Sequence, residues 1–287
     1  RTQLIEVVPA ADHHVAQHAR RHARRAGDRH RSVGRPGLVQ RRAGADIGLV
    51  APAVIVALEA QDQFSFESHT KAAAAWKAGK FTAEVVPITV RETFVGADMK
   101  KQTREFVVAT DEGIRADTTV EGLAKLKPAF AQGGTVTAGN SSQTSDGAAF
   151  VIVMSDRMMK QLNLKPVARM MSYAVAGVEP RIMGIGPVAA IPKALDRAGI
   201  KLADLDLIEL NEAFAAQAIA VSKGLGLDMT KTNPNGGAIA LGHPVGCSGA
   251  FIATKAIYEL HRTGGKYALV TMCIGGGQGI AVVFERL

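Results

Sequence analysis

Apolar and polar residues follow helix-like and strand-like patterns from about residue 59 to the end of the chain. Helical spacing, often closed by a glycine, predicts the helices, and short apolar or alternating runs predict the strands. The expected helices are 61–79, 187–199, 213–226 and 248–262, with short ones after Thr119 and up to Leu162. The expected strands are 81–90, 148–155, 167–177, 204–210, 267–274 and 279–285. Strands that alternate with helices predict a layered α/β fold.

The first 58 residues follow a different pattern. They contain ten arginines, no lysine, five of the eight histidines and four acidic residues, and they show no clear helical or strand period. Such a segment could be a basic arm for nucleic acid or a membrane, but it lacks the interleaved aromatic residues of a stacking surface. It could also be a transit peptide, but it has almost no serine. We interpret it as out-of-frame translation of a GC-rich gene and expect it to be disordered.

The net charge of +8 is concentrated in this segment, which carries +6 and leaves +2 (8 − 6) for the remaining residues. This distribution argues against a nucleic-acid-binding protein and is typical of an enzyme surface.

Two cysteines in 287 residues fit a reducing compartment, so we expect a cytoplasmic protein. The longest apolar run, near 47–58, is about 12 residues long, which is too short to span a bilayer. No signal peptide is recognisable, and we expect no membrane span.

Candidate chemistry gathers near the carboxyl end of the chain. His243 lies in "NPNGGAIALGHPVGCSGA", between a glycine and a proline and just before an expected helix, where it could act as a general base or a hydrogen-bond donor. Cys273 ends an apolar strand and is followed by "GGGQG", whose backbone N–H groups could form an oxyanion hole. The alternatives are a packed structural histidine and a buried cysteine that acts as a small hydrophobic residue.

Two further positions are candidates. Asn211 and Glu212 follow the expected strand "DLDLIEL", at the edge where α/β sheets place their sites, although an N-cap for the next helix would explain them equally well. Cys247 falls where a helix starts, and we interpret it as structural. No Cys or His pair has the spacing of a zinc site, so we expect no metal.

The motifs "NEAF", "GHP" and "CIGGGQG" stand in this order with about 30 residues between them. Together with "GVEPRIMGIGPVAAIPKAL" and "AGNSSQTSDGAA", they resemble the thiolases, the acetyl-CoA acyltransferases. The resemblance covers about residue 59 to the end. It implies an α/β, thiolase-like layered α-β-α fold. It also implies a loop region with a remnant of the amino-terminal domain at 59–165 and the carboxyl-terminal domain at 166–287.

The resemblance also implies a reaction, either the thiolytic cleavage of a 3-ketoacyl-CoA in fatty-acid β-oxidation or the reverse Claisen condensation. A nucleophilic cysteine is acylated and passes the acyl group to coenzyme A. His243 would activate the nucleophile and help to bind the thioester oxygen. Cys273 would exchange a proton with the enolate, Asn211 would hold a water in one oxyanion hole, and the N–H of Gly275 would serve a second. Coenzyme A is a substrate here, and no other cofactor is expected.

Seven further residues are expected at the acyl-CoA site because they match the family's motifs. Arg115 would lie near the nucleotide, and Gly122 stands where related sequences often have a serine that contacts coenzyme A, so one such contact is in doubt. The pantetheine channel and the acyl end would be formed by Phe130, Ala138, Ser142, Met183, Ala213 and Phe214.

One departure from the family concerns its nucleophile, a cysteine in a Cys-x-Ser context of the amino-terminal half. This chain has no cysteine before Cys247. We therefore expect the amino-terminal nucleophile domain to be absent, the fold to be incomplete, and the chain alone to be inactive. The intact family forms dimers or tetramers, so a homo-oligomer is expected. The alternative is a non-catalytic subunit or remnant that binds acyl-CoA.

Overall fold

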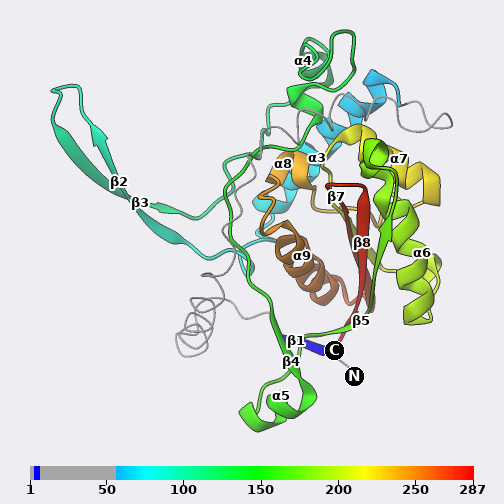
Figure 1. Cartoon of the computed structure of the whole chain (residues 1–287). Helices are drawn as coiled ribbons and strands as arrows, with labels where there is room; N and C mark the ends of the chain where they lie inside the picture. Colours follow the sequence, from blue (N-terminus) through cyan, green and yellow to red (C-terminus); the bar gives the residue numbers. More distant parts are fainter. Residues whose placement is uncertain (1–2, 7–55) are drawn as a thin grey trace.

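The computed structural model describes residues 3–6 and 56–287, which form three layers of helix, sheet and helix and a projecting hairpin (Figure 1). Within these residues the main sheet runs in the order β4-β1-β5-β8-β7-β6, and a second sheet pairs β2 with β3. The strands are β1 (Gln3–Glu6), β2 (Ile88–Val95), β3 (Lys101–Val108), β4 (Ile152–Ser155), β5 (Ala168–Gly177), β6 (Leu207–Leu210), β7 (Tyr267–Ile274) and β8 (Gln278–Arg286). The helices are α3 (Leu58–Lys77), α4 (Val120–Leu123), α5 (Asp156–Leu162), α6 (Gly186–Ala198), α7 (Ala215–Leu225), α8 (Ala238–Leu241) and α9 (Ser248–Thr263).

Strand directions bring two chain exits together at one edge of the sheet. β6 and β7 are parallel, with Leu210 opposite Thr271, whereas the other neighbouring strands of this sheet are antiparallel. A parallel pair needs a long crossover, which α7, α8 and α9 supply. The carboxyl ends of β6 and β7 therefore lie side by side, so that the residues that follow β6 lie beside the last residues of β7.

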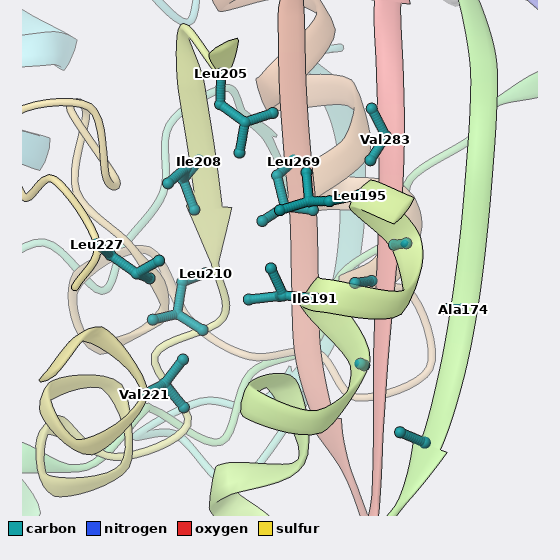
Figure 2. Packing of buried hydrophobic residues seen from close by; sticks show 14 of the residues in the cluster. Ala174, Ile191, Leu195, Leu205, Ile208, Leu210, Val221, Leu227, Leu269 and Val283 are labelled. Atoms are coloured by element: carbon teal, nitrogen blue, oxygen red, sulfur yellow. The ribbon is translucent and has the colours of Figure 1, made fainter. Parts of the chain in front are cut away.

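One face of the sheet packs against α6 and α7. Figure 2 shows Ile191 and Leu195 of α6 directed towards Leu269 of β7, and all three belong to one buried cluster. Val221 of α7 and Val283 of β8 belong to the same cluster. Burial of a Leu or Ile side chain contributes about 1.5–3 kcal/mol, so this apolar interface is a main source of the sheet's stability.

The opposite face packs against α9. Ile257 and Leu260 of this helix join Ala268 of β7 and Phe284 of β8 in a second buried cluster. Since successive strand residues point to opposite faces, Ala268 and Leu269 enter different clusters. These two interfaces confirm the layered α/β architecture that the sequence predicts.

Most expected helices and strands are present, but two strand predictions were wrong in part. Residues 81–87 form turns and coil rather than a strand, because the Glu84 and Val85 N–H groups bond back to the Phe81 carbonyl. The strand begins only at Ile88, after a proline that cannot donate to a ladder. In the expected strand 148–155, only the last four residues pair, and Phe150 is exposed.

The first 58 residues, predicted to be disordered and out of frame, lie mostly outside the described residues. The exceptions are Gln3–Glu6, which pair with β4 and β5, and the residues from Val56 to the start of α3. The proposed boundaries at 58/59 and 165/166 stay predictions. Among the described residues, no helix combines the length and apolar character that a membrane crossing requires.

Candidate active site

His243 is held in a tight turn between α8 and α9. Gly242 before it has φ +96°, a conformation that L side chains rarely adopt, and a Cβ there would collide with the Ser145 side chain. The His243 backbone N–H donates to the Gln143 carbonyl oxygen at 3.2 Å. The Gln143 side chain in turn donates to the Ile239 carbonyl oxygen at 2.9 Å, which ties the same loop to α8. The main chain at His243 is therefore fixed by hydrogen bonds from the loop around Gln143.

Both ring nitrogens of His243 face polar groups. Nδ1 lies 2.6 Å from the Ser248 hydroxyl oxygen, and Nε2 lies 3.4 Å from the side-chain nitrogen of Asn211. The side chain is half-buried, and burial lowers the pKa of the imidazole below its usual value. The ring is therefore neutral at neutral pH, with one nitrogen as donor and the other as acceptor.

Asn211 reaches this ring because its main chain continues the parallel pairing of β6 and β7. Its N–H donates to the Thr271 carbonyl oxygen at 2.9 Å. Cys273 lies two residues further along β7, so Asn211 and Cys273 come from neighbouring strand ends at one edge of the sheet, and His243 reaches this edge from the turn between α8 and α9 through its contact with Asn211. The N-cap alternative for Asn211 and Glu212 was wrong, because α7 begins at Ala215 with no side-chain cap.

Glu212 has a different role from its neighbour. Its buried carboxylate accepts hydrogen bonds from the Ser68 hydroxyl at 2.7 Å and the Asn233 amide at 2.8 Å. It also accepts one from the N–H of Ile239 at 3.3 Å. These bonds join α3, the turn after Thr232 and α8. Glu212 therefore anchors the segment that leads to His243.

Cys273 lies near the end of β7 and packs against a buried apolar cluster that includes Ala213 and Phe214. Desolvation by these neighbours raises the pKa of its thiol to about 11, so the thiol is protonated at neutral pH. Gly275 follows in the exposed turn between β7 and β8, where Gly276 and Gly277 have φ +88° and +90°. Cys247 lies directly before α9, and burial raises the pKa of its thiol as well.

Six of the seven expected acyl-CoA residues divide into two groups. Phe130 packs edge-on against Phe214, with ring centroids 5.8 Å apart, in the cluster that also contains Ala213 and Cys273. The Ser142 N–H donates to the Ala213 carbonyl oxygen at 3.0 Å, so it borders the same cluster. Met183 is half-buried in a short 3-10 helix, Pro180–Ile185, and none of the contacts described here joins it to this group.

Arg115 and Ala138 line a separate cavity of about 330 Å³. The cavity also contains His69, which the sequence patterns did not single out; its Nδ1 accepts the Arg115 backbone N–H at 3.2 Å. Burial, and then the charge of Arg115, lower the pKa of His69. At Gly122, where one expected contact with coenzyme A was in doubt, the backbone N–H donates to the Thr119 hydroxyl, so that Thr119 caps α4. The only hint of His69 in the sequence is its place in a helix otherwise rich in alanine.

Two other site residues were missed for a similar reason. Ser248 and Gln143 are ordinary polar residues of a helix start and a loop, and only the fold brings them to His243. In the part of the chain that the structure describes, no cluster of three His, Cys, Asp or Glu side chains could hold a metal ion.

Two known protein families match this chain, and proteins of known name resemble it in sequence. The family described as "Thiolase, C-terminal domain" matches residues 164–286, and "Thiolase, N-terminal domain" matches residues 9–157. The chain is 53% identical over 230 residues to a 3-ketoacyl-CoA thiolase of Bacillus subtilis, which covers 80% of this chain and 59% of the relative. It is 48% identical over 257 residues to an acetyl-CoA acetyltransferase of Escherichia coli, covering 88% and 63%.

Solved structures agree with these sequence matches. The acetyl-CoA acetyltransferase of Bacillus anthracis superposes with a TM-score of 0.79 at 44% identity, over 86% of this chain and 60% of that one. A human mitochondrial 3-ketoacyl-CoA thiolase in complex with CoA superposes with a TM-score of 0.75 at 43% identity, over 88% and 58%. The chain therefore spans about three fifths of the length of these relatives.

These matches correct one expectation from the sequence. The amino-terminal thiolase domain was predicted to be absent, but the family match over residues 9–157 shows that a part of it is present. The prediction failed because it rested on one missing cysteine motif and on the unusual composition of the first 58 residues. The expectation of an incomplete fold likewise has no support from the matches. Two family domains and relatives at about half identity show that the chain belongs to the thiolase family.

Proposed function

We propose that this chain carries the acid–base and oxyanion-binding half of a thiolase-type acyl-CoA C-acyltransferase. The observation that carries the proposal is the approach of the Asn211 amide to His243 Nε2, at 3.4 Å, beside the strand that bears Cys273. A neutral donor, an imidazole and a protonated thiol at one sheet edge suit a reaction in which a thioester oxygen gains charge and an enolate takes a proton.

The roles follow from the chemistry of each group. In thiolysis, a thiolate attacks the 3-keto carbon of a 3-ketoacyl-CoA, the C2–C3 bond breaks, and its electron pair leaves as the enolate of acetyl-CoA. Cys273 gives its proton to that enolate, which its raised pKa of about 11 permits because the thiol is protonated beforehand. His243, Asn211 and the Gly275 N–H bind the oxygens on which charge develops. The thiol of coenzyme A then attacks the acyl-enzyme thioester, its proton goes to the Cys273 thiolate, and the nucleophile leaves as a thiolate.

Coenzyme A is the proposed second substrate, and no further cofactor is proposed. Support comes from the human relative, whose structure is a complex with CoA, and from the cavity lined by Arg115 and Ala138. The Phe130, Ala213 and Phe214 cluster would then meet the acyl end, because it adjoins Cys273. A role in β-oxidation and a homo-oligomeric state, which rest on the family resemblance, and a cytoplasmic location, which rests on the presence of only two cysteines, complete the proposal.

The thiol that accepts the acyl group is the one part of this chemistry without an assigned residue. The chain has two cysteines, of which Cys273 is assigned to proton transfer, and burial raises the pKa of Cys247. A thiol with a raised pKa is a poor nucleophile at neutral pH. We therefore propose that the chain alone does not complete thiolysis. The same observation favours the second candidate function, a non-catalytic thiolase-like subunit that binds acyl-CoA.

The test combines binding and turnover on the purified full chain. Titration calorimetry with coenzyme A measures binding, chromatography of acetoacetyl-CoA plus CoA measures thiolysis, and intact mass detects an acyl adduct. We expect binding without an adduct or turnover, and Arg115→Ala should weaken the binding. Absence of any CoA binding would refute the acyl-CoA function. Turnover by the chain alone would refute the inactivity and show that one of its own residues accepts the acyl group.

A further experiment separates the two candidates. A separately purified amino-terminal fragment of a relative, carrying a cysteine nucleophile, is added to the chain before the assay. Turnover that appears only with both parts, and that is lost in His243→Ala, supports a chain that supplies the acid–base half. Binding of CoA with no turnover in any mixture supports the non-catalytic subunit.

A further inference from the structure

The hairpin formed by β2 and β3 gathers exposed apolar side chains. It projects from the body of the molecule (Figure 1), and among the described residues its two strands pair only with each other. The exposed large apolar residues on it are Ile88, Phe94, Val95, Met99, Phe106 and Val107. Monomeric proteins rarely collect such residues on one exposed element, and an isolated two-stranded sheet is at best marginally stable in water. The hairpin is therefore a candidate surface for association with another chain.

The turn of the hairpin determines which backbone groups of each strand are free. The Gly96 N–H donates to the Lys100 carbonyl oxygen at 2.9 Å, so these two residues form a hydrogen-bonded pair. Hydrogen-bonded and non-hydrogen-bonded pairs alternate along an antiparallel ladder. Counted back from the turn, the pair of Thr93 and Thr103 is non-hydrogen-bonded. The N–H and C=O groups of Thr93 therefore point out from the edge of β2, and those of Thr103 point out from the edge of β3.

The edge of β3 presents the backbone groups of every second residue, which are Lys101, Thr103, Glu105 and Val107. Such a free edge is a template for pairing with another strand. In the part of the chain that the structure describes, no strand occupies it. A partner strand must offer an unpaired edge of its own, and a second copy of β3 offers one with the same spacing.

Charge favours one register for two copies of β3. About a two-fold axis the strands run antiparallel, and hydrogen-bonded pairs form only between residues whose backbone groups point out from the edge. With Thr103 on the axis, Lys101 of each copy lies opposite Glu105 of the other. With Arg104 or Glu105 on the axis, that residue would face its own copy, and like charges directly opposite each other are destabilising. The register with Thr103 on the axis therefore joins opposite charges on both sides of the axis.

We propose that the free edge of β3 is a docking surface for β3 of a second copy of this chain, with Thr103 at a two-fold axis. The two hairpins then form one antiparallel sheet with the edges of β2 at its two ends. Such an interface is isologous, so pairing through it closes at two copies and does not continue into a fibre. The proposal assigns a surface to the homo-oligomeric state of the proposed function, and it does not depend on acyl transfer.

Two matched proline variants test which edge pairs. Thr103→Pro removes an N–H from the edge of β3, and Thr93→Pro removes one from the edge of β2. Neither N–H belongs to the ladder between the two strands, so both variants should keep the hairpin. Analytical ultracentrifugation measures the mass of the full chain at one concentration, and circular dichroism checks its folding. We expect an unmodified chain of at least dimer mass, half that mass for Thr103→Pro, and an unchanged mass for Thr93→Pro.

Two charge variants test the register. In paired identical copies, Lys101→Glu sets two carboxylates opposite each other, and Glu105→Lys sets two ammonium groups opposite each other. Each variant alone should associate about tenfold more weakly than the unmodified chain. An equal mixture of the two should associate as the unmodified chain does, because every pair in the mixed dimer again joins opposite charges. Native mass spectrometry, with one variant labelled with ¹⁵N, identifies the mixed dimer.

Three results would overturn the proposal. The first is an unmodified chain that is monomeric, and the second is an equal mass for the two folded proline variants. The third is a mixture of Lys101→Glu and Glu105→Lys that forms no more mixed dimer than either variant forms with itself, and it applies whether or not the proline variants fold. No coenzyme A or acyl-CoA is present in these measurements. A failure of CoA binding or acyl transfer would therefore leave their result unchanged.

Discussion

Replacement of Lys255 by methionine tests the most buried ion pair of the described core. Lys255 Nζ on α9 lies 2.7 Å from the Glu209 carboxylate on β6, and the two side chains are 1% and 2% exposed. Nζ also donates to the Gly236 carbonyl oxygen at 2.6 Å. Methionine keeps the apolar volume but leaves a buried carboxylate and a carbonyl without their donor.

The expected cost follows from this geometry. Removal of one partner from a buried pair costs about 3–5 kcal/mol, because the remaining charge is uncompensated. Burial already raises the pKa of Glu209 from 4.5 to about 7 even with the lysine present. At 1.36 kcal/mol for each pKa unit, ionisation of Glu209 in the folded state costs about 3 kcal/mol at a pH above 7.

The sign of the pH dependence is therefore defined. A carboxyl group with a raised pKa in the folded state holds its proton more tightly there than in the unfolded state. Its contribution to stability is full below about pH 4.5 and is lost as the pH rises through about 7. Glu84 follows the same rule, since burial raises its pKa to about 7. The penalty of Lys255→Met should grow from pH 5 to pH 8, because the variant lacks the cation that favours ionised Glu209.

Urea unfolding followed by circular dichroism, at pH 5 and at pH 8, measures these free energies. The matched control is the double variant Glu209→Gln/Lys255→Met, which removes both charges. A neutral pair should recover most of the loss at pH 8, apart from about 1 kcal/mol for the Gly236 carbonyl. The reasoning is refuted if the single variant loses less than about 1 kcal/mol at pH 8, or if the double variant is as unstable as the single one.

Three further predictions test the core, the site turn and the site thiol. Leu269→Ala should lower the free energy of unfolding by about 2–5 kcal/mol in the same assay, because Leu269 is fully buried between the sheet and α6, whereas Val175→Ala on an exposed strand position should change it by much less. Gly237→Ala should cost about 1–3 kcal/mol, because its Cβ would collide with the buried Glu212 carboxylate; an unchanged denaturation midpoint would contradict this contact. Cys273 should react with iodoacetamide at pH 8 roughly 100- to 250-fold more slowly in the folded chain than in the urea-unfolded chain, because its thiol pKa is about 11 in the folded state, and the rate should rise tenfold for each pH unit up to about 11; fast labelling detected by peptide mass spectrometry would show that the thiol is not desolvated.

Elements with a strong apolar period were predictable from the sequence. The helix that ends near Gly79 and the helix at 248–262 agree with α3 and α9 to within a few residues. The strands at 167–177 and 267–274 agree with β5 and β7. β5 and α9 bury mainly one face, so the packing that stabilises them also determines the pattern that reveals them, whereas β7 is a short apolar run that is buried on both faces.

The hairpin β2–β3 was not predictable in the same way. It projects from the body of the chain, and nearly all of its residues are exposed or half-exposed (Figure 1). Without a buried face, its strands carry no in-and-out alternation that a sequence pattern could detect. Its turn, from Gly96 to Lys100, has a methionine at positive φ, Met99, instead of the Asn-Gly or Asp-Gly that marks many hairpins.

The candidate site likewise contains residues that a local sequence pattern reveals and residues that only the fold brings together. Asn211, His243 and Cys273 stand in short glycine-rich or strand-end motifs, and such local context identified them. The groups that place them are polar residues from distant parts of the chain. Ser68, for example, is 144 residues from the Glu212 carboxylate that it contacts. No local pattern encodes a hydrogen bond over that separation.

Hydrogen bonds between distant residues explain how a site can lie at the ends of a short strand and a four-residue helix. β6 and α8 are too short to be rigid by themselves. Asn233 has a positive φ of 45°, and its side chain exchanges two hydrogen bonds with the backbone of Leu210, at 2.8 and 2.9 Å, so it extends the end of β6 as a further strand residue would. The same amide donates to Glu212, which also accepts from the N–H of Ile239 in α8. Asn211 and His243 therefore face each other because one buried polar network fixes both the strand end and the helix that leads to the histidine, and each missing hydrogen bond in it would leave a desolvated group unpaired.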